Sequence, residues 1–184
     1  MAIEPVQIFR RAPKMSIPLQ PADNAIIMVA TMRDVDAITS LTRAAYEKWV
    51  PLIGRVPLPM KVDYAVALKV HRFDLLVDGG RLVGLIETVP QDRHLLVVNV
   101  AIEPTMQSRG FGRRLMAHAE TLASASDLDC IRLYTNSRFA ENIRLYTSLG
   151  YEVEHEEALN GGVAVHMRKW LRGVCDSWPC AKAE

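Results

Sequence analysis

The segment that most constrains the fold is a strand that runs through a glycine-containing turn into a helix. The apolar run 94–102 predicts the strand, which Pro104 ends, and apolar residues at helical spacing predict a helix over 109–125. The first turn of a helix leaves backbone N–H groups unpaired and carries partial positive charge. Gly110 and Gly112 place no side chain in the way of a ligand, and Arg109, Arg113 and Arg114 add charge. The turn therefore suits a phosphate group.

Two common phosphate-binding motifs do not fit this turn. A dinucleotide-binding loop needs a third glycine where this chain has Leu115, and a P-loop needs Gly-Lys-Ser/Thr, which the segment lacks. The pattern that remains is Gln107-x-x-Gly110-x-Gly112, directly after the strand and Glu103-Pro104.

The rest of the chain alternates short strands and helices. Further strands are expected at 25–30, 73–77, 81–89, 130–135, 151–156 and 163–170, and helices at 35–49, 64–70 and 140–149. Asp34 is the expected N-cap of the first helix, and Pro51 is expected to end it. Asp78-Gly79-Gly80 and Asn160-Gly161-Gly162 predict hairpin turns. The order predicts a mixed α/β fold with hairpins in the middle and at the end, without regular βαβ alternation.

Length and composition favour a single domain. The 184 residues, 49% of them hydrophobic, suit one core over 25–171, with an N-terminal extension at 1–24 and a C-terminal tail at 172–184. A formal charge of +1 gives no reason to expect nucleic acid or a membrane as the main partner. No apolar run approaches the ~18 residues that a membrane span needs. The start does not resemble a signal peptide, so a cytoplasmic location is the default expectation.

The cysteines predict neither a metal site nor a disulfide. Cys130 lies in an apolar stretch and is expected to be buried, whereas Cys175 and Cys180 lie in the tail. Two tail cysteines alone do not form a zinc site, and disulfides are unusual in the cytosol.

The glycine turn and a second segment together resemble the GNAT family of N-acetyltransferases. The turn is similar to the pyrophosphate-binding loop of that family. The run Tyr134-Thr135-Asn136, followed by Leu145-Tyr146 and Gly150-Tyr151, is similar to its second motif, and 166–171 to its last strand. The resemblance covers about 25–171. It implies the α/β GNAT fold, a mixed and mostly antiparallel central sheet with a parallel splayed strand pair, flanked by helices.

The resemblance also implies acetyl-CoA as the co-substrate, held between the strands at 94–102 and 130–136. The backbone of Val100 and Ile102 is then expected to pair with the pantetheine arm. Asn136 and Asn142 are candidates to bind its amides or the phosphates. The turn residues expected to hold the pyrophosphate are Gln107, Ser108, Arg109, Gly110, Phe111, Gly112 and Arg113.

Attack of a neutral amine on a thioester needs an oxyanion site, a proton for the leaving thiolate and removal of an amine proton. A backbone N–H on the splayed strand suits the first need. The family's general-acid role falls on Tyr146, which an ordinary pKa of ~10 keeps protonated. The base stays open between Glu87, His94, His166 and a water chain. Glu87 is the named candidate, because a carboxylate facing the cleft would have a raised pKa.

Residues 44–64 resemble a bacterial GNAT subgroup with a Tyr-x-x-x-Val-Pro-x-Ile-Gly-Arg-x-Pro-x-Pro-Met loop. The acceptor contacts expected from this segment are Tyr46, Trp49, Arg55, Met60 and Tyr64, with simple packing as the alternative, above all for Trp49. Arg55 could bind a substrate carboxylate. Relatives often carry Glu directly before Asn-Val-Ala in the third central strand. Here Val98 stands at that position, so this chain lacks the base if that Glu serves as one in the relatives.

The sequence is compatible with three functions to different degrees. The first is acetyl transfer to an amine on a small molecule or peptide, and a homodimer is compatible with it. The second is a non-catalytic acyl-CoA-binding module, against which the presence of Tyr146 speaks. The third is a nucleotide-binding protein, which the missing third glycine and missing P-loop lysine disfavour.

Overall fold

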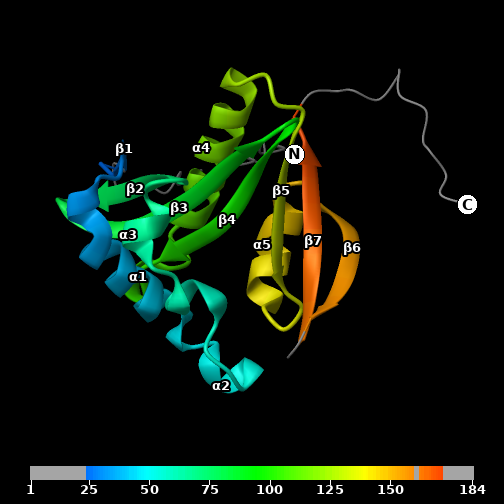
Figure 1. The fold of residues 1–184 in the computed structure, drawn as a ribbon, viewed down its shortest axis with the longest axis horizontal. Helices are drawn as coiled ribbons and strands as arrows, with labels where there is room; N and C mark the ends of the chain where they lie inside the picture. Colours follow the sequence, from blue (N-terminus) through cyan, green and yellow to red (C-terminus); the bar gives the residue numbers. More distant parts are fainter. Residues whose placement is uncertain (1–23, 160–161, 172–184) are drawn as a thin grey trace, which may run out of the picture.

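The computed structural model describes residues 24–159 and 162–171, and its framework is one mixed β-sheet. The strand order is β1-β2-β3-β4-β5-β7-β6 (Figure 1). All neighbouring strands are antiparallel except β4 and β5, which are parallel. The strands are β1 (Ile26–Val29), β2 (Arg72–Asp78), β3 (Arg81–Gln91), β4 (His94–Ile102), β5 (Cys130–Asn136), β6 (Glu152–Leu159) and β7 (Gly162–Trp170). This confirms the mixed α/β fold that the sequence predicts.

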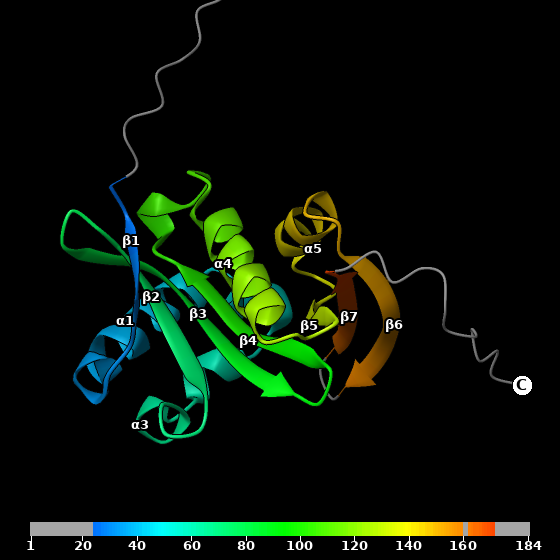
Figure 2. The same cartoon turned by 90° about the horizontal axis from the view of Figure 1, so that it is seen from above.

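Helices cover both faces of the sheet. The α-helices are α1 (Val35–Glu47), α2 (Val50–Ile53), α3 (Tyr64–Ala67), α4 (Phe111–Ala125) and α5 (Ala140–Ser148), and the 3-10 turns are η1 (Met32–Asp34), η2 (Leu58–Lys61) and η3 (Pro104–Met106). Figure 2 shows α4 and α5 on one side of the sheet and α1 and α3 on the other. The fully buried Leu115 and Ile131 belong to the core on the α4 side, and Ile38 and Phe73 to the core on the α1 side.

The segment after α1 differs from the sequence expectation. Helix α1 ends at Glu47, and Pro51 lies in the first turn of a separate helix, α2, where a proline costs no hydrogen bond. Gly54, with φ of 69°, ends α2 in the left-handed conformation. Helix α3 stops at Ala67 rather than near residue 70. The side chain of Asp34 accepts a hydrogen bond from Thr31 N instead of capping α1.

Strands β4 and β5 diverge along their length. They are paired only from His94–Cys130 to Val97–Leu133, although β4 continues to Ile102 and β5 to Asn136. A bulge contributes to this, because Glu87 faces Asn99 and Thr88 faces Val97, which leaves Val98 as the extra residue on β4. Figure 1 shows the two strands meeting near the top of the view and spreading toward α2. The splayed pair implied by the family resemblance is therefore present.

Several expectations concern the ends of the chain. Cys130 is buried, as expected. The extension at 1–23, the tail with Cys175 and Cys180, and Asn160-Gly161 of the last turn lie outside the described residues. Within the described part of the chain, no helix is long and apolar enough to cross a membrane.

Candidate active site

Two cavities meet where β4 and β5 separate. The larger, the α4 cavity, has a volume of about 510 Å³ and lies between the start of α4, the end of α1 and helix α5. The smaller, the β5 cavity, has a volume of about 170 Å³ and lies between β4, β5, the loop after α2 and the ends of β6 and β7. Four residues line both and define the junction: Tyr46, Val100, Asn142 and Tyr146. The site can therefore hold two ligands whose ends touch.

The walls of the α4 cavity contain most of the residues predicted to bind acetyl-CoA. They are Val100, Ile102, Gln107, Ser108, Gly110, Phe111, Gly112, Arg113 and Asn142. Arg109 lines neither cavity, and its guanidinium contacts the Met106 sulfur at 3.5 Å. Asn136 lines the β5 cavity instead. Because α4 begins at Phe111, its first backbone N–H groups face this cavity without helical partners.

The two glycines of the turn have different roles. Gly110 has φ of 87°, a conformation that favours glycine, and a Cβ there would meet no protein atom within 4 Å. Glycine at this position therefore permits the positive φ of the turn and is not needed to avoid a clash within the protein. A Cβ on Gly112 would lie 3.4 Å from Leu145 Cδ2, so this glycine allows α4 and α5 to pack closely.

Positive charge around the α4 cavity comes from three elements. Arg113 and Arg144 line it from α4 and α5, and Lys48 lines it from the end of α1. Lys48 Nζ lies 2.8 Å from Glu141 Oε2 and donates to Gln107 Oε1 at 3.1 Å, which ties three segments together. Sequence reasoning missed Lys48, because its role depends on tertiary contacts. Arg114 instead points toward β1 and donates to the Ala25 carbonyl.

A buried carboxylate faces the β5 cavity. Glu87 is 3% exposed, and its Oε1 lies 2.5 Å from Nδ1 of the half-buried His71. Burial raises the pKa of Glu87, and its hydrogen bond and charge interaction with His71 act in the opposite direction. Val98, which stands where relatives often have Glu, lines the same cavity. The two other base candidates line neither cavity: His166 pairs with Glu157, and His94 stands at the far end of β4.

Tyr146 lies at the junction with its hydroxyl free of partners among the described residues. It is 7% exposed, and burial raises its pKa to about 12. Burial also raises the pKa of Tyr46 well above its ordinary value. Both phenols are therefore neutral at physiological pH.

The residues predicted to contact the acceptor separate into three groups. Tyr46 and Arg55 line the β5 cavity. Trp49 lines the α4 cavity and stacks on Phe139 with 4.4 Å between ring centres. Met60 and Tyr64 line neither cavity, so the structure does not bring them to the acceptor site. Tyr64 is 2% exposed and donates to the Pro59 carbonyl at 2.8 Å, because the chain packs it under the loop.

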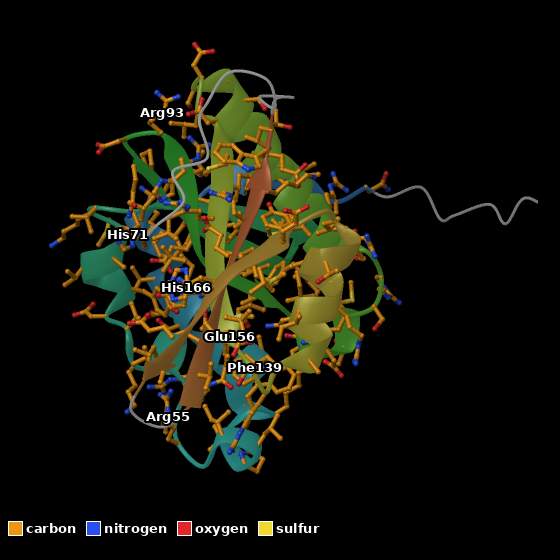
Figure 3. All side chains as sticks on the ribbon, turned by 90° about the vertical axis from the view of Figure 1, so that its right-hand side faces the viewer. Arg55, His71, Arg93, Phe139, Glu156 and His166 are labelled. Carbon is orange, nitrogen blue, oxygen red and sulfur yellow. The ribbon has the colours of Figure 1, made fainter. Side chains whose placement is uncertain are left out.

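Arg55 has no partner within the described residues. Its Nε is buried without a hydrogen bond, although the residue lines the β5 cavity. Apolar residues line the same cavity, among them Pro57, Leu58 and Val62. Figure 3 shows Arg55 at the end of the molecule opposite to Arg93, near Phe139.

The fold agrees with the comparisons with known proteins. Residues 70–153 match the family model described as an acetyltransferase (GNAT) domain. No curated protein matches the chain. Among solved structures, the ribosomal-protein-S18-alanine N-acetyltransferase of Escherichia coli superposes with a TM-score of 0.67 at 18% identity, covering 84% of this chain and 99% of that one.

Two other solved structures contain the co-substrate or its product. The PaiA N-acetyltransferase of Thermoplasma acidophilum in complex with coenzyme A has a TM-score of 0.65 at 16% identity, covering 79% of this chain and 98% of its own. The yncA protein of Salmonella typhimurium with acetyl-CoA has a TM-score of 0.62 at 20% identity, covering 86% and 99%. The protein is thus of the N-acetyltransferase class. Residues 70–153 are the part of the chain that matches the GNAT acetyltransferase domain family.

Proposed function

We propose that this chain, through its domain at 25–171, transfers an acetyl group from acetyl-CoA to a primary amine by direct attack within a ternary complex. The observation that carries the proposal is the junction, where Tyr46, Val100, Asn142 and Tyr146 line both cavities. Two ligands that fill the α4 and β5 cavities would meet there, so neither needs a covalent link to the protein.

The α4 cavity fits acetyl-CoA. The free N–H groups at the start of α4 suit a pyrophosphate, and the open space at Gly110 leaves room for it. Lys48, Arg113 and Arg144 supply complementary charge. The unpaired part of β4, with Val100 and Ile102, offers backbone groups to the pantetheine amides, and Asn142 a side chain. When bound, this co-substrate supplies the activated acetyl group.

Residues at the junction and in the adjoining β5 cavity suit the three needs of the reaction: an oxyanion site, a proton for the leaving thiolate and removal of an amine proton. As the amine nitrogen forms its bond to the acetyl carbon, the carbon–sulfur bond breaks. Glu87 would take one N–H proton, and its raised pKa makes it a stronger base than an exposed carboxylate. Tyr146 would donate its proton to the leaving thiolate and recover one from solvent. The free backbone N–H groups of β4 would stabilise the oxyanion.

The β5 cavity favours an acceptor with an apolar body and an anionic group near the amine. Leu58, Val62 and Val163 give it apolar walls, and Arg55 contributes a guanidinium without a partner among the described residues. A guanidinium binds a carboxylate through two parallel hydrogen bonds. The similar structures include an enzyme whose name gives a protein alanine as its substrate. An amino acid or peptide amine is consistent with these features.

Two measurements test the proposed function. Native mass spectrometry of the purified protein should show bound coenzyme A or acetyl-CoA. Thiol release should then be followed with acetyl-CoA and a panel of L-phenylalanine, phenethylamine, spermidine and an alanine-terminated peptide. Amine-dependent thiol release supports the transferase. Bound coenzyme A without any amine-dependent release would instead support a non-catalytic acyl-CoA-binding module, and failure to bind it would contradict both.

A further inference from the structure

A chain of three hydrogen bonds runs from the junction into the protein. The Tyr46 hydroxyl contacts Asn99 Oδ1 at 2.9 Å, Asn99 Nδ2 contacts the Tyr64 hydroxyl at 3.3 Å, and the Tyr64 hydroxyl contacts the Pro59 carbonyl at 2.8 Å. The members come from four separate elements: α1, β4, α3 and η2. Asn99 and Tyr64 are 3% and 2% exposed, so water does not compete for these bonds.

The last acceptor fixes the direction of every bond in the chain. A carbonyl only accepts, so the single proton of Tyr64 goes to Pro59. The Tyr64 oxygen can then only accept, which turns the amide nitrogen of Asn99 toward it. The amide oxygen of Asn99 therefore faces Tyr46 and takes the Tyr46 proton. As a result, the Tyr46 oxygen presents only lone pairs to the junction.

The two junction tyrosines consequently differ in what they can do. The proton of Tyr46 is committed to Asn99, so Tyr46 can accept a hydrogen bond but not protonate a thiolate. The hydroxyl of Tyr146 has no partner among the described residues, so it can donate. Glu87 also accepts when ionised, and it lies opposite Asn99 in the β3–β4 register. An amine bound in the β5 cavity therefore meets two groups that accept hydrogen bonds, Tyr46 and Glu87.

We propose that Tyr46 and Glu87 together select primary amines by requiring two N–H groups, and that Asn99 is the positioning residue that keeps Tyr46 an acceptor. The inference rests on the proposed function. A neutral primary amine attacks through its lone pair, gives one N–H proton to Glu87 and still has a second N–H for Tyr46. A secondary amine or an alcohol has only one hydrogen, so it leaves Tyr46 unpaired in a buried site, which opposes its reaction.

The test compares the panel amine with the highest kcat/KM and its N-methyl derivative. The wild type should prefer the primary amine. In Tyr46→Phe that preference should fall at least about tenfold, because only the primary amine loses a bond. Asn99→Leu should also lower the preference for the primary amine, since the Tyr46 hydroxyl is then free to rotate. The same N-methyl substrate is used with every variant. A change in the ratio between variants therefore reports the hydrogen bond and not the bulk of the methyl group.

Thr88→Val is the matched control. Thr88 is fully buried on β3 and lines neither cavity, and its hydroxyl has no hydrogen-bond partner among the residues described, so this nearly isosteric change should leave the ratio unaltered. If Tyr46→Phe folds and its ratio of kcat/KM values equals that of the wild type, the proposal is overturned. If the ratio changes in Tyr46→Phe but not in Asn99→Leu, the positioning role of Asn99 is overturned. If the wild type releases no thiol with any amine, both this inference and the proposed function fail. If the wild type releases thiol but the ratio is unaltered in Tyr46→Phe, only this inference is contradicted and the proposed function stands.

Discussion

Nδ1 of His71 lies 2.5 Å from Oε1 of Glu87, which joins a half-buried imidazole to a carboxylate that is only 3% exposed. His71 stands directly before β2, and Glu87 lies in β3, opposite Phe73 of β2. The carboxylate faces the β5 cavity while the imidazole reaches solvent. The pair therefore connects the proposed base with the outside of the protein.

The pH dependence of the reaction should follow this pair. Glu87 acts as a base only when ionised, so kcat/KM should fall as the pH falls through its pKa. Burial raises that pKa, and the His71 hydrogen bond and charge lower it. His71→Ala removes the lowering contributions, so the acid limb of the profile should move to higher pH. His71→Gln keeps a neutral donor and should restore part of the shift. An acid limb at the same pH in His71→Ala would exclude Glu87 as the titrating base.

Tyr146→Phe should slow the chemical step. The change keeps the ring packed near Tyr151, 6.1 Å away between centres, and deletes only the hydroxyl. Loss of a general acid typically costs about a hundredfold or more in rate, so kcat should fall by that order while the Kd of acetyl-CoA changes little. Single-turnover kinetics and calorimetry measure the two quantities. Equal single-turnover rates in the two proteins would assign Tyr146 to packing alone.

Gly110→Ala should weaken acetyl-CoA binding more than tenfold, which is more than ~1.4 kcal/mol. A methyl group there would project into open space that the phosphates are proposed to occupy. The positive φ also strains the folded chain by about 1–2 kcal/mol. Gly54→Ala is the control, because Gly54 has φ of 69°, equally open surroundings and no place in either cavity wall. Similar losses of thermal stability with similar losses of acetyl-CoA affinity would contradict a phosphate site at Gly110.

Arg55→Ala should raise the acceptor KM and leave the acetyl-CoA KM unchanged. The decisive quantity is the ratio of kcat/KM for L-phenylalanine to that for phenethylamine, its decarboxylated form. The ratio should fall in Arg55→Ala, and Arg55→Lys should restore it only partly, since lysine lacks the planar fork. If Arg55 only closes its loop, thermal stability drops and the ratio stays the same.

The sequence predicted the parts of the fold that depend on local pattern. Strand β4 was predicted with its observed bounds, because its apolar run is limited by His94 and Pro104. The glycine turn indicated the start of α4 for the same local reason. The position of β7 between β5 and β6 has no local signal, since it depends on which strand edge the last hairpin pairs with. Likewise, a proline in the first turn of a helix and one that ends a helix look alike in sequence, as Pro51 shows.

The candidate site was predicted unevenly for the same physical reason. The turn residues and Tyr146 follow each other along the chain within motifs, so their spacing identified them. Asn99, His71 and Lys48 have roles only through contacts with residues far away in sequence. One signal was present for Asn99, which is a polar residue within the apolar run that follows His94 in β4. Tyr64 shows the reverse case, because its aromatic type suggested the acceptor site while its burial makes it part of the support beneath Tyr46.

The pattern of initial rates tests the central claim most directly. Thiol release should be measured while acetyl-CoA and the active amine are varied together. Since the two cavities meet at Tyr46, Val100, Asn142 and Tyr146, both substrates are expected to be bound when the acetyl group moves. Double-reciprocal plots should therefore give intersecting lines. Parallel lines, the mark of an acetylated enzyme intermediate, would contradict direct transfer within a ternary complex.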